Sequence, residues 1–141
     1  MTYGSSTWSL SDPIINKLRT AQNSMARSIL KIKRKNYIPT KKIRGKLKNT
    51  RDISTFIRYR KCGWAGHISR LEDNRWTQRV TFWFPPHLKR KKGRQKTRWV
   101  DDNTQFLKNK NFREIVLNRS EWGRLRETFA RYGPKILNIV N

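Results

Sequence analysis

An aromatic residue followed by a carboxylate pair, Trp99-Val100-Asp101-Asp102, is the strongest candidate for catalysis in this sequence. Paired carboxylates can bind two Mg²⁺ ions and promote phosphoryl transfer. That chemistry requires the pair on a tight hairpin between apolar strands, with a third aspartate on a neighbouring strand. Lysine and arginine precede this pair, however, and a helical apolar period follows it. Acidic residues in the first turn of a helix compensate its dipole. We therefore interpret Asp101 and Asp102 as helix-start residues, and expect neither a catalytic residue nor a metal ligand in this chain.

His67 and Asp73 form a second candidate, because a histidine and a carboxylate could act together as the acid–base pair of a nuclease. Only their spacing supports this alternative, and a Mg²⁺-dependent cleavage assay would test it. A histidine at the edge of an apolar helix face more often packs against its neighbours or caps a helix than acts as a general base. We therefore interpret His67 as structural.

Gly63 and Gly66 have the Gly-x-x-Gly spacing of the single-strand-binding loop in KH domains. That loop must lie between two helices, whereas the apolar period of this region continues through both glycines. We predict instead that they share one side of a helix and let another helix approach closely.

A cationic run between positions 85 and 98 is the strongest candidate for binding, and Pro85-Pro86 at its start predicts an exposed, irregular loop. The chain has 34 Lys and Arg against 9 Asp and Glu, a net charge of +25 that favours RNA and/or DNA as partner. Trp76 and Trp83 flank the loop and could stack on bases. The alternative is a solvated face or a nuclear-import signal. The predicted phosphate contacts are Lys89, Arg90, Lys91, Lys92, Arg94, Lys96 and Arg98.

The remaining composition excludes several classes of protein. Cys62 is the only cysteine, so there is no disulfide, and with His67 and His87 it falls short of the four ligands of a structural zinc site. The N-terminus lacks the features of a signal peptide, and no apolar run is long enough to span a membrane. We expect an intracellular protein, nuclear or cytoplasmic, with no cofactor and no membrane partner.

Apolar residues at spacings of three and four predict two long helices, 13–34 and 51–71. Shorter helices are predicted at 40–47, 75–83, 112–117 and 121–132, with Asn118 as the cap of the last, and Thr97 begins another helix that carries Trp99. The fold class is therefore all-α, a small helical bundle with an irregular basic loop. The predicted core residues are Leu18, Met25, Ile57, Trp64, Ile68, Trp99, Trp122 and Leu125.

Five short motifs, in this order, give the chain a resemblance to LINE-type (non-LTR) retrotransposon endonuclease–reverse transcriptases over about residues 3–132. The first resembles the segment that follows the polymerase palm in that family, and the last resembles its closing helix. Ser6, Gln95 and Gly63 depart from the family pattern. The motifs are Tyr3-Gly4-Ser5-Ser6-Thr7-Trp8, the helix with Ile15-Asn16-Lys17-Leu18-Arg19 and Met25-Ala26-Arg27-Ser28-Ile29-Leu30, Trp64-Ala65-Gly66-His67-Ile68-Ser69-Arg70-Leu71, Gly93-Arg94-Gln95-Lys96-Thr97-Arg98-Trp99-Val100-Asp101-Asp102, and Arg119-Ser120-Glu121-Trp122.

The resemblance implies a truncated or degenerate copy of the thumb and the region after it, which grips template and primer but cannot polymerise alone. The fingers, the Mg²⁺-binding palm and the endonuclease of the parent polyprotein would precede residue 1. The implied organisation is a palm remnant at 1–12, a thumb-like region at 13–71, a short helix and basic loop at 72–98, C-terminal helices at 99–133 and a tail at 134–141. The alternative is a free-standing basic nucleic-acid-binding protein of ribosomal or DNA-packaging type.

Overall fold

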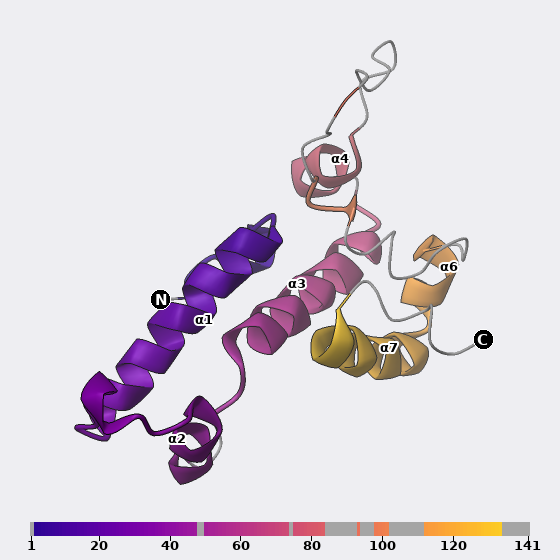
Figure 1. Cartoon of the computed structure of the whole chain (residues 1–141). Helices are drawn as coiled ribbons and strands as arrows, with labels where there is room; N and C mark the ends of the chain where they lie inside the picture. The colour runs from indigo at the N-terminus through magenta and orange to yellow at the C-terminus, as the bar shows by residue number, and fades with distance from the viewer. Residues whose placement is uncertain are drawn as a thin grey trace.

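The computed structural model describes residues 2–47, 50–73, 75–83, 93, 98–101 and 112–133. Within these ranges every regular element is helical, which confirms the predicted all-α class (Figure 1). The elements in chain order are η1 (Ser5–Thr7), α1 (Asp12–Ile29), η2 (Arg34–Asn36), α2 (Thr40–Lys46), α3 (Ile53–Ser69), α4 (Trp76–Phe82), α6 (Phe112–Leu117) and α7 (Arg119–Tyr132).

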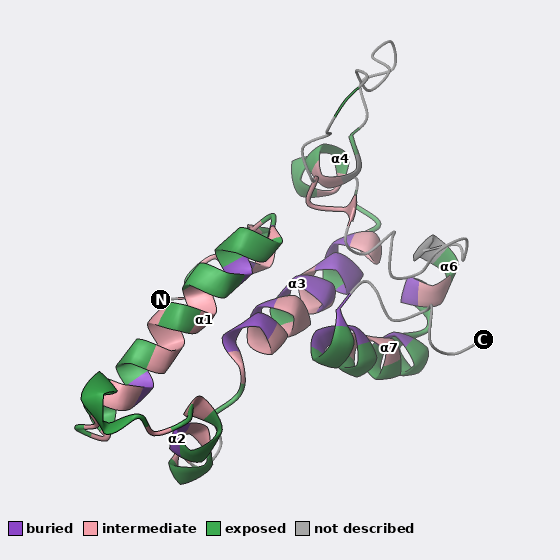
Figure 2. Ribbon diagram, viewed as in Figure 1, coloured by how far each residue is buried: buried purple, intermediate pink, exposed green. Residues whose placement is uncertain are grey.

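Helix α3 is the centre of the fold, since it contacts η1, α1, α4, α6 and α7. Figure 2 shows its buried residues between α1 on one side and α7 on the other. Two small apolar clusters result: one joins Cys62 and Ala65 to Trp122 and Phe129, and the other joins the segment before α1 to Ile57. No helix in the described part of the chain is long and apolar enough to cross a membrane.

Polar side chains from α1 and α2 hold the start of α3. Asp52 caps it by accepting the backbone N–H of Ser54 at 3.0 Å, and Gln22 Oε1 accepts the N–H of Ile53 at 3.0 Å. Arg44 of α2 pairs with Asp52 at 2.9 Å, and Arg19 of α1 lies 3.5 Å from the same carboxylate. Burial alone would raise the pKa of Asp52, but the hydrogen bonds and both cations outweigh it and lower the pKa to about 2.

The predicted close approach at Gly63 and Gly66 is confirmed, since α7 packs on that side of α3. A Cβ at Gly66 would contact the Trp122 indole, and one at Gly63 would lie 2.7 Å from the Arg126 guanidinium. Trp122 Nε1 donates to the Cys62 carbonyl at 3.2 Å. Both glycines lie inside α3, so the KH-type loop is excluded.

Helix α1 ends at Ile29, five residues before the predicted end. The Lys31 N–H donates to Ser28 O at 3.1 Å and the Ile32 N–H to Arg27 O at 2.9 Å. With Lys31 at φ 53°, these bonds form a Schellman motif. This motif usually has glycine at the left-handed position, so a lysine there leaves no signal in the sequence.

The core position predicted for Met25 is wrong, because its side chain is 51% exposed. Helix α1 instead meets α3 through Ile15, which packs in one cluster with Ile53 and Ile57. This contact also includes Arg19 and Gln22, which bond to the start of α3. A stripe drawn through apolar residues alone therefore missed the packed face.

The other predicted core residues fall into two groups. Ile57, Ile68 and Trp122 are buried, whereas Leu18, Trp99 and Leu125 are partly buried against the two apolar clusters. Trp64 is also only partly buried, contrary to the prediction that it lies in the core. It lies at the edge of the buried face of α3, where it lines an open pocket.

Candidate nucleic-acid interface

Two of the motifs, distant from each other in the sequence, meet beside the centre of α3. The Trp99 indole Nε1 donates to the Ser6 carbonyl at 2.7 Å, across 93 residues of sequence. The Lys61 ammonium lies 5.4 Å from the centre of the Trp99 ring, and the Lys61 side chain is fully buried. The N-terminal segment, the centre of α3 and the turn at 98–101 thus form one structural unit.

Asp101 closes that turn. Its Oδ2 accepts the backbone N–H of Arg98 at 2.7 Å, while its own N–H donates to the Arg98 carbonyl at 3.2 Å. The first bond is one half of a capping box, in which an acidic side chain accepts an N–H from three residues earlier, and the second is a backbone turn bond. The carboxylate therefore holds a turn of the backbone. In the described residues no group of three or more His, Cys, Asp or Glu is placed to bind a metal ion.

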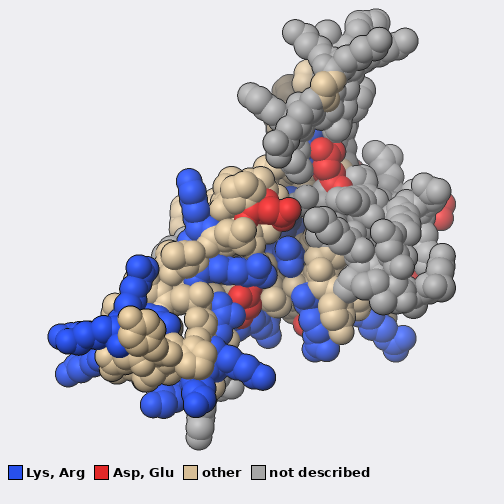
Figure 3. All heavy atoms as spheres, viewed as in Figure 1, with Lys and Arg blue, Asp and Glu red and all other residues tan. Residues whose placement is uncertain are grey.

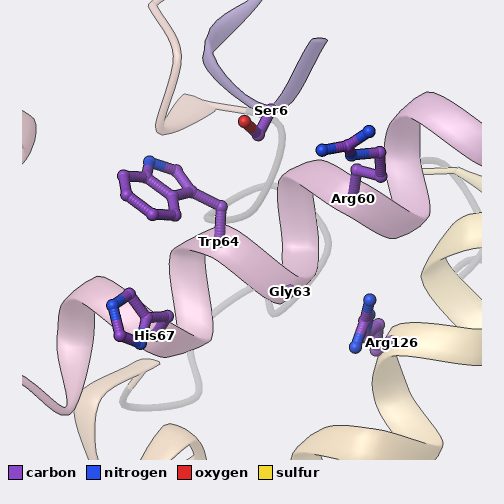
Figure 4. A pocket seen from close by; sticks show the side chains of 6 residues that line it. All are labelled: Ser6, Arg60, Gly63, Trp64, His67 and Arg126. Atoms are coloured by element: carbon purple, nitrogen blue, oxygen red, sulfur yellow. The ribbon is translucent and has the colours of Figure 1, made fainter. Parts of the chain in front are cut away.

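His67 is exposed, and its ring centre lies 5.5 Å from that of Trp64. Figure 4 shows the two side chains together on one side of the pocket. Asp73, its predicted partner in the nuclease alternative, forms an ion pair with Arg75. The geometry therefore offers no support for a His67–Asp73 pair.

Most of the predicted basic loop lies outside the described residues, namely Lys89, Arg90, Lys91, Lys92, Arg94 and Lys96. Arg98 is described, and its backbone belongs to the turn closed by Asp101. The flanking Trp76 and Trp83 are 75% and 67% exposed, at the start and just after the end of α4. The Arg79 guanidinium lies 5.6 Å from the centre of the Trp76 ring. Both indoles are therefore accessible to a ligand.

A second group of cations, which the prediction of binding residues missed, surrounds the end of α1 and α2. Between positions 13 and 51 the sequence contains no Asp or Glu. Three of the arginines there bond internally: Arg19 and Arg44 to Asp52, and Arg27 to the Ile38 carbonyl at 2.9 Å. Figure 3 shows lysine and arginine gathered over this end of the molecule. We call the exposed members the cationic surface: Lys31, Lys33, Arg34, Lys35, Lys41, Lys42 and Lys46.

One signal in the sequence could have predicted this surface, the absence of any carboxylate over 39 consecutive positions, 13 to 51. The run at 89–92 is more compact and is therefore the more obvious of the two signals. Only the structure shows which cations of the longer stretch bond within the fold and which remain exposed at the surface.

The chain is similar to a transposon-derived protein of Caenorhabditis elegans, with 31% identity over 134 residues. The match covers 86% of this chain and 48% of the relative, so the chain spans about half the length of the protein it matches. No family model and no solved structure matches the sequence. Homology to a transposon-derived protein is therefore what the comparisons establish.

Proposed function

We propose that this chain is the nucleic-acid-binding, thumb-like C-terminal part of a retrotransposon RNA-directed DNA polymerase, and that it contacts the phosphates of RNA and/or DNA. Its palm and fingers would belong to the rest of the parent polyprotein. Homology to a transposon-derived protein supports this origin, as does the contact between motifs that resemble the LINE-type family.

The cationic surface is the observation that carries the proposal. Its seven exposed side chains have no carboxylate within their own stretch of sequence, and the nearest following one, Asp52, is engaged by Arg19 and Arg44. Like charges repel one another over distances up to the screening length, which is about 8–10 Å in physiological salt. A polyanion relieves this repulsion, and each neutralised phosphate releases counterions.

Two exposed aromatic side chains of α4 add a second kind of contact to the proposal. Trp76 and Trp83 are largely exposed, although burying an indole is more favourable than leaving it in water. Stacking on unpaired bases would cover them without sequence preference. The proposed contacts are thus phosphates at the cationic surface and the loop, and bases at α4.

We expect no catalytic activity from the chain alone. The Asp101 carboxylate is engaged in its turn, and the parent's Mg²⁺ would be bound by the palm. Primer extension and Mg²⁺-dependent cleavage should both be undetectable. Activity that disappears in Asp101→Asn would contradict this part.

The test is fluorescence anisotropy with labelled oligonucleotides of about 20 nucleotides, RNA and DNA, in several sequences. Replacing Lys33, Lys41 and Lys42 by Gln should weaken binding by about tenfold or more, by a similar factor for every sequence. The matched control replaces Arg119, Arg124 and Arg131, which are exposed on α7, by Gln and removes the same charge. Equal losses from the two triple variants would mean that only net charge matters, as in a free-standing basic protein.

A further inference from the structure

An open pocket of about 430 Å³ lies where α3 passes η1 and α7. Figure 4 shows the indole of Trp64 and the imidazole of His67 together on one side and the guanidinium groups of Arg60 and Arg126 on the other. Gly63 lies between the two sides, where the absence of a side chain keeps the pocket open. Ser6 completes the lining from η1.

The Arg126 guanidinium is held in place before any ligand arrives. Its Nε donates to the Tyr59 carbonyl at 3.0 Å, and its Cζ lies 3.5 Å from the centre of the Tyr59 ring. A Cβ at Gly63 would lie 2.8 Å from Nη2, so the glycine makes the room that this group occupies. In the described part of the chain, neither Arg126 nor Arg60 is paired with a carboxylate. The described lining of the pocket therefore presents positive charge.

The two sides of the pocket suit the two parts of a nucleotide. Guanidinium groups bind phosphate through planar, paired N–H donors, and an indole face stacks on a base of any sequence. The volume lies in the range of small-molecule sites. A base inside a duplex has both faces covered, so only an unstacked nucleotide could use the Trp64 ring.

We propose that this pocket binds one unstacked nucleotide of single-stranded nucleic acid, with its phosphate between Arg60 and Arg126 and its base against Trp64. This inference rests on the proposed nucleic-acid-binding function. Such a pocket would make the chain prefer single-stranded over double-stranded nucleic acid. The pocket contacts the base through stacking, so the preference is independent of sequence.

The experiment compares two single-stranded octanucleotides of equal charge, one normal and one with abasic sites throughout. The wild-type chain should bind the normal strand about fivefold or more tighter, the lower end of what one stacked base contributes. Trp64→Leu should remove a large part of that preference, whereas Trp64→Phe should retain most of it. The matched control is Tyr132→Leu, which removes an exposed aromatic ring from α7, outside the pocket and outside α4. Thermal unfolding of each variant shows whether it is folded.

A separate pair of variants tests the phosphate-binding side of the pocket. Arg60→Gln should weaken both strands by the same factor, and by more than Arg124→Gln, which removes the same charge from an exposed position on α7. A Trp64→Leu chain that keeps the preference, or a wild-type chain without one, would overturn the pocket while leaving general binding intact. Failure to bind either strand would overturn the proposed function itself. Inorganic phosphate should compete with both strands for the subsite. If phosphate weakens binding no more than an inert salt of the same ionic strength does, the phosphate subsite is contradicted.

Discussion

Replacing Gly66 by Ala tests the packing of α7 on α3, on which the fold depends. An added Cβ would contact the Trp122 indole at Nε1 and lie 2.7 Å from Cδ1. Trp122 is buried and cannot move without breaking its hydrogen bond to the Cys62 carbonyl. The added methyl group must therefore displace either the indole or the whole of α7.

The size of the effect follows from three contributions. Overpacking of a core costs about 1–3 kcal/mol, and a buried donor left without its acceptor costs about 1–3 kcal/mol. Alanine regains roughly 1 kcal/mol of helix propensity over glycine. We expect Gly66→Ala to lower the free energy of unfolding by about 1–5 kcal/mol, measured by urea denaturation followed by circular dichroism.

Gly123→Ala and Gly45→Ala are the matched controls, because a Cβ at either position meets nothing within 4 Å. Both glycines lie inside helices, so each substitution should stabilise the chain by up to about 1 kcal/mol. If Gly66→Ala proved as stable as these controls, the described contact between α3 and α7 would be wrong.

Three further predictions follow from single side chains. The pKa of Asp52 in the folded chain, about 2, lies below its ordinary value of 3.8, so its contribution is present above about pH 4 and disappears as the pH falls from about 4 to about 2. It should amount to about 2 kcal/mol, and unfolding curves of Asp52→Asn should lack this pH dependence; a variant with the wild-type profile would show that the ion pairs do not form. Burial raises the pKa of Cys62 to about 12 despite the opposing charge of Arg126, so a thiol reagent should label Cys62 slowly in the folded chain and quickly in urea; fast labelling without denaturant would contradict its burial. Asp101→Asn should cost a few tenths of a kcal/mol and leave nucleic-acid affinity nearly unchanged in anisotropy titrations, whereas a large drop in affinity would give the carboxylate a role in binding.

The helical class and the centres of the helices could be predicted, because apolar periods of three and four residues extend over most of the chain. Asp52 and Asn118 also act as caps, as their residue types indicate. The two glycines of α3 predicted a close helix contact, since glycine inside a helix otherwise costs stability.

Other features depend on interactions between distant residues and left no local signal. Lys61 is fully buried beside the Trp99 ring, although lysine in a helix normally indicates a solvated face. Gln22 faces α3 because the first N–H groups of that helix need acceptors. The pocket combines residues of η1, α3 and α7. No spacing in the sequence brings these three segments together.

The salt dependence of nucleic-acid binding tests the central proposal most directly. The wild-type chain should bind single-stranded RNA or DNA with a steep log–log slope between about 50 and 200 mM salt. Replacing Lys33, Lys41 and Lys42 by Gln, or Lys89, Arg90, Lys91 and Lys92 by Ser, should each flatten the slope by up to about 0.7–0.9 for every phosphate that the variant no longer neutralises. A slope that neither variant changes would contradict the assignment of phosphate binding to the cationic surface and the basic loop.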